Sequence, residues 1–87
     1  MSSNYVYFYN NTDLLICLGT HVKEEWRIVN VPPNEKGIVE SNTGEWVIEN
    51  EEGWLGKFNR EPFKSECIEG YECVEEYGWI IFSGRSS

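Results

Sequence analysis

The sequence predicts an all-β fold, a small antiparallel β-sandwich of about seven or eight strands, with an SH3-like barrel as the alternative. Short segments such as residues 5–9 alternate in polarity, as half-buried strands do. Turn-forming residues recur about every eight to twelve positions, which is the spacing of sandwiches and small barrels. Helical signals are weak, since only residues 59–68 could hold a turn or two and Pro62 lies inside that segment.

The first strand is expected at residues 5–9, where Tyr5, Tyr7 and Tyr9 alternate with Val6 and Phe8. The same criteria predict a turn at 10–13, an interior strand at 14–18, a polar loop at 19–25 and a strand at 26–31. The run at 14–18 is continuously apolar, so Cys17 within it is predicted to be buried and unreactive.

Pro32 and Pro33 end the strand at 26–31, because a proline nitrogen cannot donate to a ladder. The remaining strands are expected at 37–40, 45–49, 54–58 and 79–82, together with a hairpin of 64–68 against 71–74. In the strand at 45–49, Trp46 and Ile48 fall on one face.

Length and charge restrict the classes of function. The 87 residues form a single domain, residues 1–87, with no room for a second core. The net charge of −8, from 15 acids and 7 bases, argues against direct binding to nucleic acid and to anionic membranes. This charge suits a protein partner with a basic surface, although it also serves solubility alone.

The chain has no apolar run long enough to span a membrane and no signal-peptide pattern, so a cytoplasmic location is expected. Its three cysteines, Cys17, Cys67 and Cys73, favour reduced thiols in that setting. A disulfide between Cys67 and Cys73 is the alternative. Metal binding is disfavoured because the cysteines lack close ligand spacing and His21 is the only histidine.

Catalysis has little support in the sequence. A nucleophile needs an oriented base beside it, and His21 lies in a segment without a nucleophile motif. We therefore predict a protein that is not an enzyme, with no catalytic residue, metal or other cofactor.

Acidic residues gather in two segments that contain no base. The residues proposed to contact a partner are Glu45, Glu49, Glu51 and Glu52 in the first segment and Glu69, Glu72 and Glu75 in the second. Outward-facing acids from two hairpins can merge into one negative patch that imitates phosphates. The alternative is two separate hairpin ends that are simply solvated.

The four tryptophans should divide between the core and the surface, because a small sandwich rarely encloses four indoles. An exposed aromatic ring beside acids is a good contact for Arg or Lys of a partner. Trp46 and Trp54 are the candidates for this role, and they also define the alternative of a peptide-binding groove.

Several motifs occur in order along the first two thirds of the chain: Asn10-Asn11-Thr12 before an apolar strand, Val31-Pro32-Pro33, Gly44-Glu45-Trp46-Val47-Ile48 and residues 54–59. Over residues 10–59 the chain resembles the β domain of the von Hippel–Lindau family, which implies a β-sandwich. A second likeness, over residues 53–58, is to SH3-like barrels, which keep a tryptophan beside a ligand groove.

The von Hippel–Lindau family binds a hydroxylated proline in a pocket formed by Tyr, Ser, His and Trp side chains. The resemblance places Ser41 and Trp46 at the Ser and Trp positions. Ile28 falls at the Tyr position, and the His position holds Glu45 or is lost to a gap. No segment matches the helical domain that recruits a ubiquitin ligase, so ligase function is not expected.

The leading functional hypothesis is a non-enzymatic interaction module whose acidic face binds and inhibits a basic, nucleic-acid-handling protein, as viral or phage anti-defence proteins and bacterial immunity proteins do. The alternative is a peptide-recognition module with an aromatic groove at Trp46 or Trp54.

Overall fold

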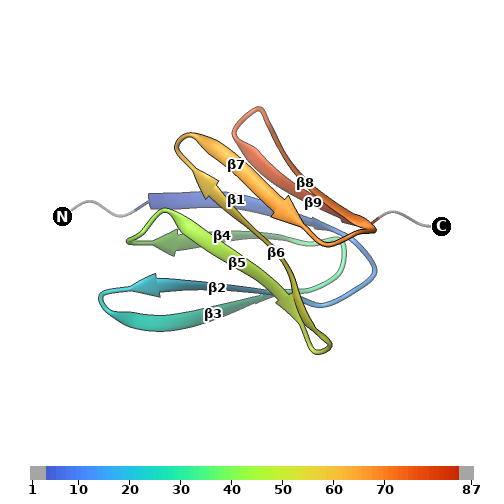
Figure 1. The fold of residues 1–87 in the computed structure, drawn as a ribbon, viewed down its shortest axis with the longest axis horizontal. Coiled ribbons are helices and arrows are strands. Elements are labelled where there is room, and N and C mark those ends of the chain that lie inside the picture. Colours follow the sequence, from blue (N-terminus) through green and yellow to red (C-terminus); the bar gives the residue numbers. More distant parts are fainter. Residues whose placement is uncertain (1–3, 85–87) are drawn as a thin grey trace.

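The structure is a computed structural model that describes residues 4–84 (Figure 1). Between these residues the chain forms nine strands and no helix. The strands are β1 (Asn4–Asn11), β2 (Ile16–Val22), β3 (Glu25–Val31), β4 (Lys36–Ser41), β5 (Glu45–Asn50), β6 (Gly53–Arg60), β7 (Phe63–Cys67), β8 (Tyr71–Glu76) and β9 (Trp79–Gly84). The described residues thus include no helix of the length and apolar character needed to cross a membrane.

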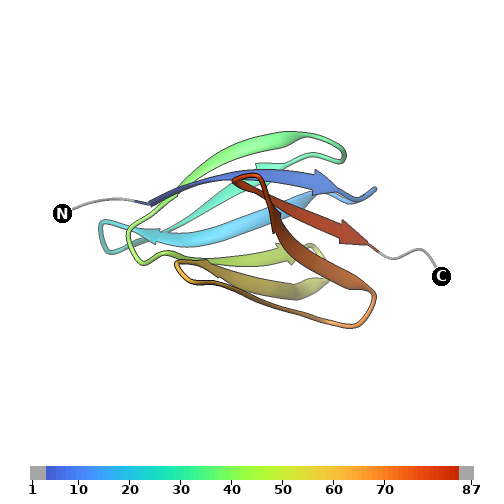
Figure 2. The same cartoon turned by 90° about the horizontal axis from the view of Figure 1, so that it is seen from above.

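The strands form two sheets that face each other, which confirms the predicted all-β fold and is compatible with a small β-sandwich (Figures 1 and 2). One sheet has four strands in the order β4-β1-β9-β8, and the other has five in the order β3-β2-β5-β6-β7. The sheets do not close into the barrel considered as the alternative. Neighbouring strands are antiparallel except β1 and β9, which run parallel from Tyr7 opposite Trp79 to Asn11 opposite Ser83.

The core lies between the sheets and is built from alternate residues of the strands. Phe8 and Phe82 come from the four-stranded sheet, and Trp46 and Phe58 from the five-stranded sheet. The rings of Trp46 and Phe58 stack with centroids 5.2 Å apart, and Phe8 stacks on Phe58 at 6.2 Å. Burial of such rings is the main source of stability in a domain of this size.

Two buried polar groups tie the sheets together at opposite ends of the sandwich. At one end, the Asn10 amide donates to the carbonyls of Leu14, Val31 and Pro32. At the other end, the Thr20 hydroxyl donates to Ser41 Oγ at 2.6 Å. Moving these loops away from the core would leave the buried polar groups unpaired, which costs stability, so the bonds hold the loops in place.

The structure corrects the prediction of a polar loop at 19–25 and an interior strand at 14–18. The strand β2 continues to Val22 and is joined to β3 by two residues, Lys23 and Glu24, with φ values of 52° and 69°. Two residues with positive φ form the tight hairpin turn that usually contains Asn or Gly. Neither residue type is present here, so the turn left no signal in the sequence.

The same strand alternates in burial instead of lying wholly inside. Ile16 and Leu18 are buried, whereas Leu14 and Leu15 precede the strand and are exposed. Cys17 is only partly buried and points to the outer face, so the prediction of a buried Cys17 is wrong. Strand geometry turns every second residue outward whatever its polarity.

The predicted hairpin of 64–68 against 71–74 is also wrong, although both segments are strands. β7 pairs with β6 in one sheet, and β8 pairs with β9 in the other. The connection at 68–70 therefore crosses from sheet to sheet. The Ile68 amide donates to Leu55 O and the Tyr71 amide to Ile68 O, which turns the chain out of the first sheet.

Candidate interaction surfaces

The residues considered for catalysis do not lie together. Cys17 and His21 both face outward from β2 but are four residues apart, which is about 13 Å along a strand. His21 instead packs edge-on against Trp26, with ring centroids 5.1 Å apart. Among residues 4–84 there is no group of three or more His, Cys, Asp or Glu side chains that could hold a metal ion.

The cysteines are free thiols, so the alternative of a disulfide between Cys67 and Cys73 is absent from the structure. Burial raises the pKa of the Cys73 thiol well above its usual range, and the nearby Cys67 raises it further. Burial also raises the pKa of Cys67, with Glu66 and Glu72 adding to the effect. Both thiols therefore stay protonated and unreactive at neutral pH.

The first acidic segment does not form a uniform negative face. Glu45 and Glu49 lie on the outer side of β5, in the middle of the five-stranded sheet. On β6, Lys57 lies opposite Val47 of β5, and on β7, Glu66 lies opposite Lys57. Positive and negative side chains therefore alternate across this face. On this face the acids are part of a mixed polar surface.

The second segment is also divided. Glu69 lies in the loop between β7 and β8. Glu72 alternates with Cys73 and points outward from the four-stranded sheet, whereas Glu75 falls on the opposite side of β8 at the edge of that sheet. The single acidic face proposed from the two hairpins is therefore not formed by these residues.

Acids do gather at one end of the sandwich. Odd-numbered strands run toward this end, so the loops β1–β2, β3–β4, β5–β6 and β7–β8 meet there (Figure 1). We call it the loop end, and its acids are Asp13, Glu35, Glu51, Glu52 and Glu69. The four described loops, residues 12–15, 32–35, 51–52 and 68–70, contain no Lys or Arg.

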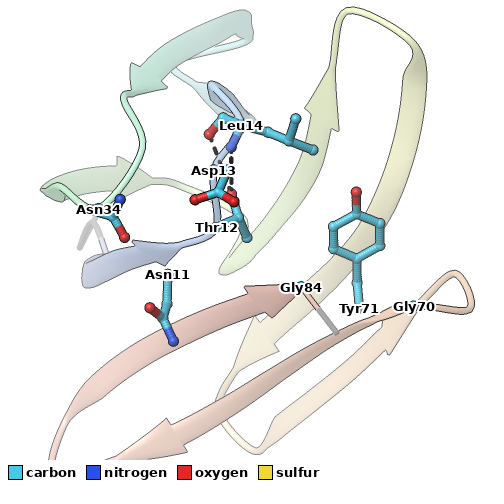
Figure 3. Close-up of a pocket in the computed structure, with 8 residues that line it drawn as sticks. All are labelled: Asn11, Thr12, Asp13, Leu14, Asn34, Gly70, Tyr71 and Gly84. Atoms are coloured by element: carbon cyan, nitrogen blue, oxygen red, sulfur yellow. Dashed lines mark hydrogen bonds between the residues drawn. The ribbon is translucent and has the colours of Figure 1, made fainter. Parts of the chain in front are cut away.

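The loop end also holds an open hollow of about 470 Å³ (Figure 3). Figure 3 shows Asn11, Asn34 and Tyr71 around the turn of Thr12 to Leu14. The Thr12 hydroxyl accepts from the Leu14 amide at 3.1 Å, and Asn10 holds the same turn from below. The hollow is lined by the apolar side chain of Leu14, by neutral polar groups and by the Asp13 carboxylate, so it offers both apolar contacts and hydrogen-bonding groups.

The two predicted tryptophans have different surroundings. Trp46 is 0% exposed in the core, so the prediction that it contributes to a binding surface is wrong. Its indole N–H is buried without a hydrogen-bond partner in the described part of the chain. Trp54 is 41% exposed beside the β5–β6 turn, opposite Glu49, and can contact a partner.

The pocket implied by the family resemblance is not open in this chain. Ser41 is fully buried and bonded to Thr20, and Trp46 points into the core. Ile28, at the Tyr position of that pocket, lies on the outer face of β3. These three residues therefore share no surface.

An apolar surface that was not predicted covers the outer side of the four-stranded sheet. We call it the aromatic face, and its residues are Tyr5, Tyr7, Tyr9, Ile38, Val74, Trp79 and Ile81. Tyr7 lies opposite both Ile38 and Trp79, at the centre of the face. Tyr7 is 51% exposed and Ile38 62%, so large side chains remain open to solvent.

The aromatic face has a defined relief. The Tyr7 and Trp79 rings have centroids 5.3 Å apart, and Lys36 Nζ lies 5.3 Å from the Trp79 ring centroid. A hollow of about 590 Å³ lies where Tyr7, Ile38 and Trp79 meet. A second, of about 250 Å³, lies on the side of Trp79 toward Tyr9 and Tyr77.

Acids border this face. Glu40 is opposite Tyr5, Glu72 is opposite Ser83 and Glu76 is opposite Trp79. Tyr77, in the turn between β8 and β9, is fully exposed beside them. The alternation of Tyr5, Tyr7 and Tyr9 indicated one face of a strand, but Val6 and Phe8 are equally apolar, so the pattern did not say which side faces solvent.

No family model matches the chain, and comparisons with the curated proteins and with the solved structures also find no match.

Proposed function

We propose that this protein is a non-enzymatic interaction module that binds a basic protein through the aromatic face and its acidic border. The observation that carries the proposal is the cluster of exposed Tyr7 and Ile38 around the half-buried Trp79 on the four-stranded sheet. Contiguous exposed apolar residues of this size mark interaction sites on small soluble proteins.

The composition of the cluster favours a protein partner. Tyr and Trp are enriched among the residues that dominate binding energy, and they act best when surrounded by a polar rim. The hollows on either side of Trp79 can receive side chains of a partner. The transfer free energy gained by fully burying one exposed aromatic side chain is about 1.5–3 kcal/mol.

The charge of the border favours a basic partner. Three acids, Glu40, Glu72 and Glu76, border the face. The base beside them is Lys36, whose ammonium lies over the Trp79 ring. With a net charge of −8 for the whole chain, the field steers basic surfaces toward the protein. Arg side chains could then pair with the acids and stack on the rings.

A second candidate keeps the phosphate-mimic hypothesis but moves it to the loop end. Its acids Asp13, Glu35, Glu51, Glu52 and Glu69 come from four loops that carry no base. Such an end could enter the nucleic-acid channel of a basic enzyme and inhibit it. The observation favouring this candidate is the charge alone, whereas the aromatic face adds apolar contacts and hollows.

The experiment is quantitative affinity capture from the cells of origin with four versions of the full chain: wild type, two surface variants and a control. Ile38→Arg places a cation at the centre of the aromatic face, and Glu51→Lys with Glu52→Lys alters the loop end. We expect Ile38→Arg to lose the captured basic proteins by more than tenfold, while the loop-end variant retains them. The wild-type complex should weaken as salt rises.

Glu66→Arg serves as the control, because Glu66 is exposed on the outer side of β7, at the edge of the other sheet and away from both surfaces. Loss of the same proteins with the loop-end variant but not with Ile38→Arg would shift the function to the loop end. If neither variant changes what is captured, both candidates are wrong.

A further inference from the structure

The strand β3 forms an uncovered edge of the five-stranded sheet. It is the last strand in the order of that sheet and lies at the lower margin of the molecule in Figure 1, beyond β4. All its residues from Glu25 to Asn30 are exposed, and even the inward-facing Val29 is 37% exposed. The opposite sheet therefore leaves both faces of β3 accessible.

The turn at Lys23 and Glu24 shows which backbone groups of β3 are free. In a two-residue hairpin with positive φ at both positions, the flanking pair, here Val22 and Glu25, exchanges both backbone hydrogen bonds. Bonded and non-bonded pairs then alternate along the ladder. Glu25, Arg27 and Val29 consequently bond to β2, whereas the N–H and C=O groups of Trp26, Ile28 and Asn30 point away from it.

An independent contact agrees with this assignment. His21 is opposite Trp26, and its carbonyl accepts a hydrogen bond from the Asn42 amide at 2.9 Å, on the side of β2 away from β3. The backbone of Trp26 must then face the other way, toward the open edge. In the part of the chain that the structure describes, no strand lies on that side.

The edge lacks most of the features that usually prevent pairing between sheets, although the charged residues Glu25 and Arg27 lie on its inward-facing side. The β2–β3 ladder runs from Ile16 opposite Val31 to Val22 opposite Glu25 without a bulge. The strand contains neither Lys nor Pro, and its two charges, Glu25 and Arg27, pair with each other at 3.4 Å. The Trp26 ring lies back across Gly19, so it leaves its own backbone uncovered.

We propose that β3 pairs with β3 of a second copy of this chain, antiparallel about a two-fold axis at Ile28. This register places Ile28 opposite Ile28 and Trp26 opposite Asn30, so all three free residues of each copy form bonded pairs, about six hydrogen bonds in total. The two sheets join into one of ten strands, five from each copy. A closed two-fold contact of this kind is the commonest form of assembly.

The charges select this register over its neighbour. With the axis at Ile28, Arg27 faces Val29 and no like charges are opposed. With the axis at Arg27, the two guanidinium groups would face each other, and only Trp26 and Ile28 would form bonded pairs. An axis at Val29 would oppose no like charges either, but it would form bonded pairs only between Ile28 and Asn30. The register centred on Ile28 therefore makes the most hydrogen bonds without opposing like charges.

The test is sedimentation equilibrium of the full chain at about 0.05 and 0.5 M salt. We expect dimers that become tighter with salt, because two copies of net charge −8 repel each other at low ionic strength. Binding of a basic partner should respond to salt in the opposite direction. The Ile38→Arg variant should dimerise like wild type, since the aromatic face lies on the other sheet.

The two-fold register is tested by Ile28→Lys and Ile28→Glu, which alter an exposed side chain and keep every bond of β3 to β2. Each variant alone should dimerise at least about tenfold more weakly, because like charges meet at the axis. An equimolar mixture should form heterodimers about as tightly as wild type. Ile28→Thr, which is uncharged and β-branched, is the matched control and should remain dimeric.

Far-UV circular dichroism verifies that each variant is folded. A wild-type chain that stays monomeric at about 1 mM in both salts would overturn the proposal and leave the edge to an extended segment of another protein. Failure of the two charged variants to combine would overturn the Ile28 register, even if wild type dimerises.

Discussion

The buried Asn10 side chain makes five hydrogen bonds. Its amide nitrogen donates to three carbonyls, and its Oδ1 accepts from the amide and hydroxyl of Thr12 at 3.1 and 2.6 Å. These bonds join the end of β1 to the loops before β2 and β4. One side chain thereby satisfies carbonyls of chain segments about 20 residues apart in the sequence.

Replacing Asn10 with Ala should lower the free energy of unfolding by about 3 kcal/mol. The loss arises because the carbonyls of Leu14, Val31 and Pro32 would each lose a donor, and the bond to Val31 O is buried. Urea unfolding followed by tryptophan fluorescence measures the change.

Asn11→Ala is the matched control, because the exposed Asn11 side chain makes one hydrogen bond, to Ser83 Oγ at 3.2 Å. It should cost under about 1 kcal/mol. Equal effects of the two substitutions would contradict the role assigned to Asn10.

At the scale of elements, the β2–β3 hairpin has a turn whose residues do not suit its conformation. Lys23 and Glu24 have φ values of 52° and 69°, which residues with a Cβ adopt at a cost. The turn is held from outside by Asn42, whose side-chain oxygen accepts from the Lys23 amide. The hairpin thus forms through tertiary contacts as well as through its own sequence.

Replacing Lys23 with Asn and Glu24 with Gly should therefore raise the free energy of unfolding by about 0.5–1 kcal/mol. Asn-Gly suits two successive residues of positive φ, and the Lys23 amide that bonds to Asn42 is retained. Thermal unfolding, with the net charge unchanged, measures the gain.

The control places the same pair at Glu51 and Glu52, which are not among the positive-φ residues of the described chain. Glycine there should destabilise the turn at high salt, where the loss of two negative charges has little effect, because it adds freedom to the unfolded chain without relieving a strained φ. A loss of stability at the β2–β3 turn would contradict this account.

At the scale of the whole molecule, negative charge outweighs positive charge and is not balanced by ion pairs. The described residues show two ion pairs, Arg27 with Glu25 and Arg60 with Glu61, and both are largely exposed. Such pairs contribute little to stability. The remaining acids repel one another, so the net charge opposes folding more than it supports it.

Reversing Glu51 and Glu52 to Lys should leave stability unchanged or raise Tm by about 1–3 °C at low salt. The two reversals bring the net charge from −8 to −4, since each adds two positive units. The gain should disappear at high salt. Scanning calorimetry at two salt concentrations measures it, with the Gln variants at the same positions giving about half the effect. A large loss of stability would show that these acids support the fold.

The sequence by itself determined the β class and most strand positions. The alternation of Val6 and Phe8 with three tyrosines, and of Trp46 with Val47, fixes which residues share a face, because successive side chains of a strand point to opposite sides. Turn residues such as Pro32, Pro33 and Gly44 ended or joined strands where expected.

The tertiary structure decided which of those faces is buried and which strands are neighbours. Both faces of β1 are apolar, and only packing against the other sheet buries Phe8 and leaves Tyr7 exposed. The split of β7 and β8 between sheets, the outward-facing, partly buried Cys17 and the uncovered edge of β3 all depend on contacts between distant segments. A local sequence pattern shows the two-residue alternation of a strand, but it does not show which other strand packs over that strand.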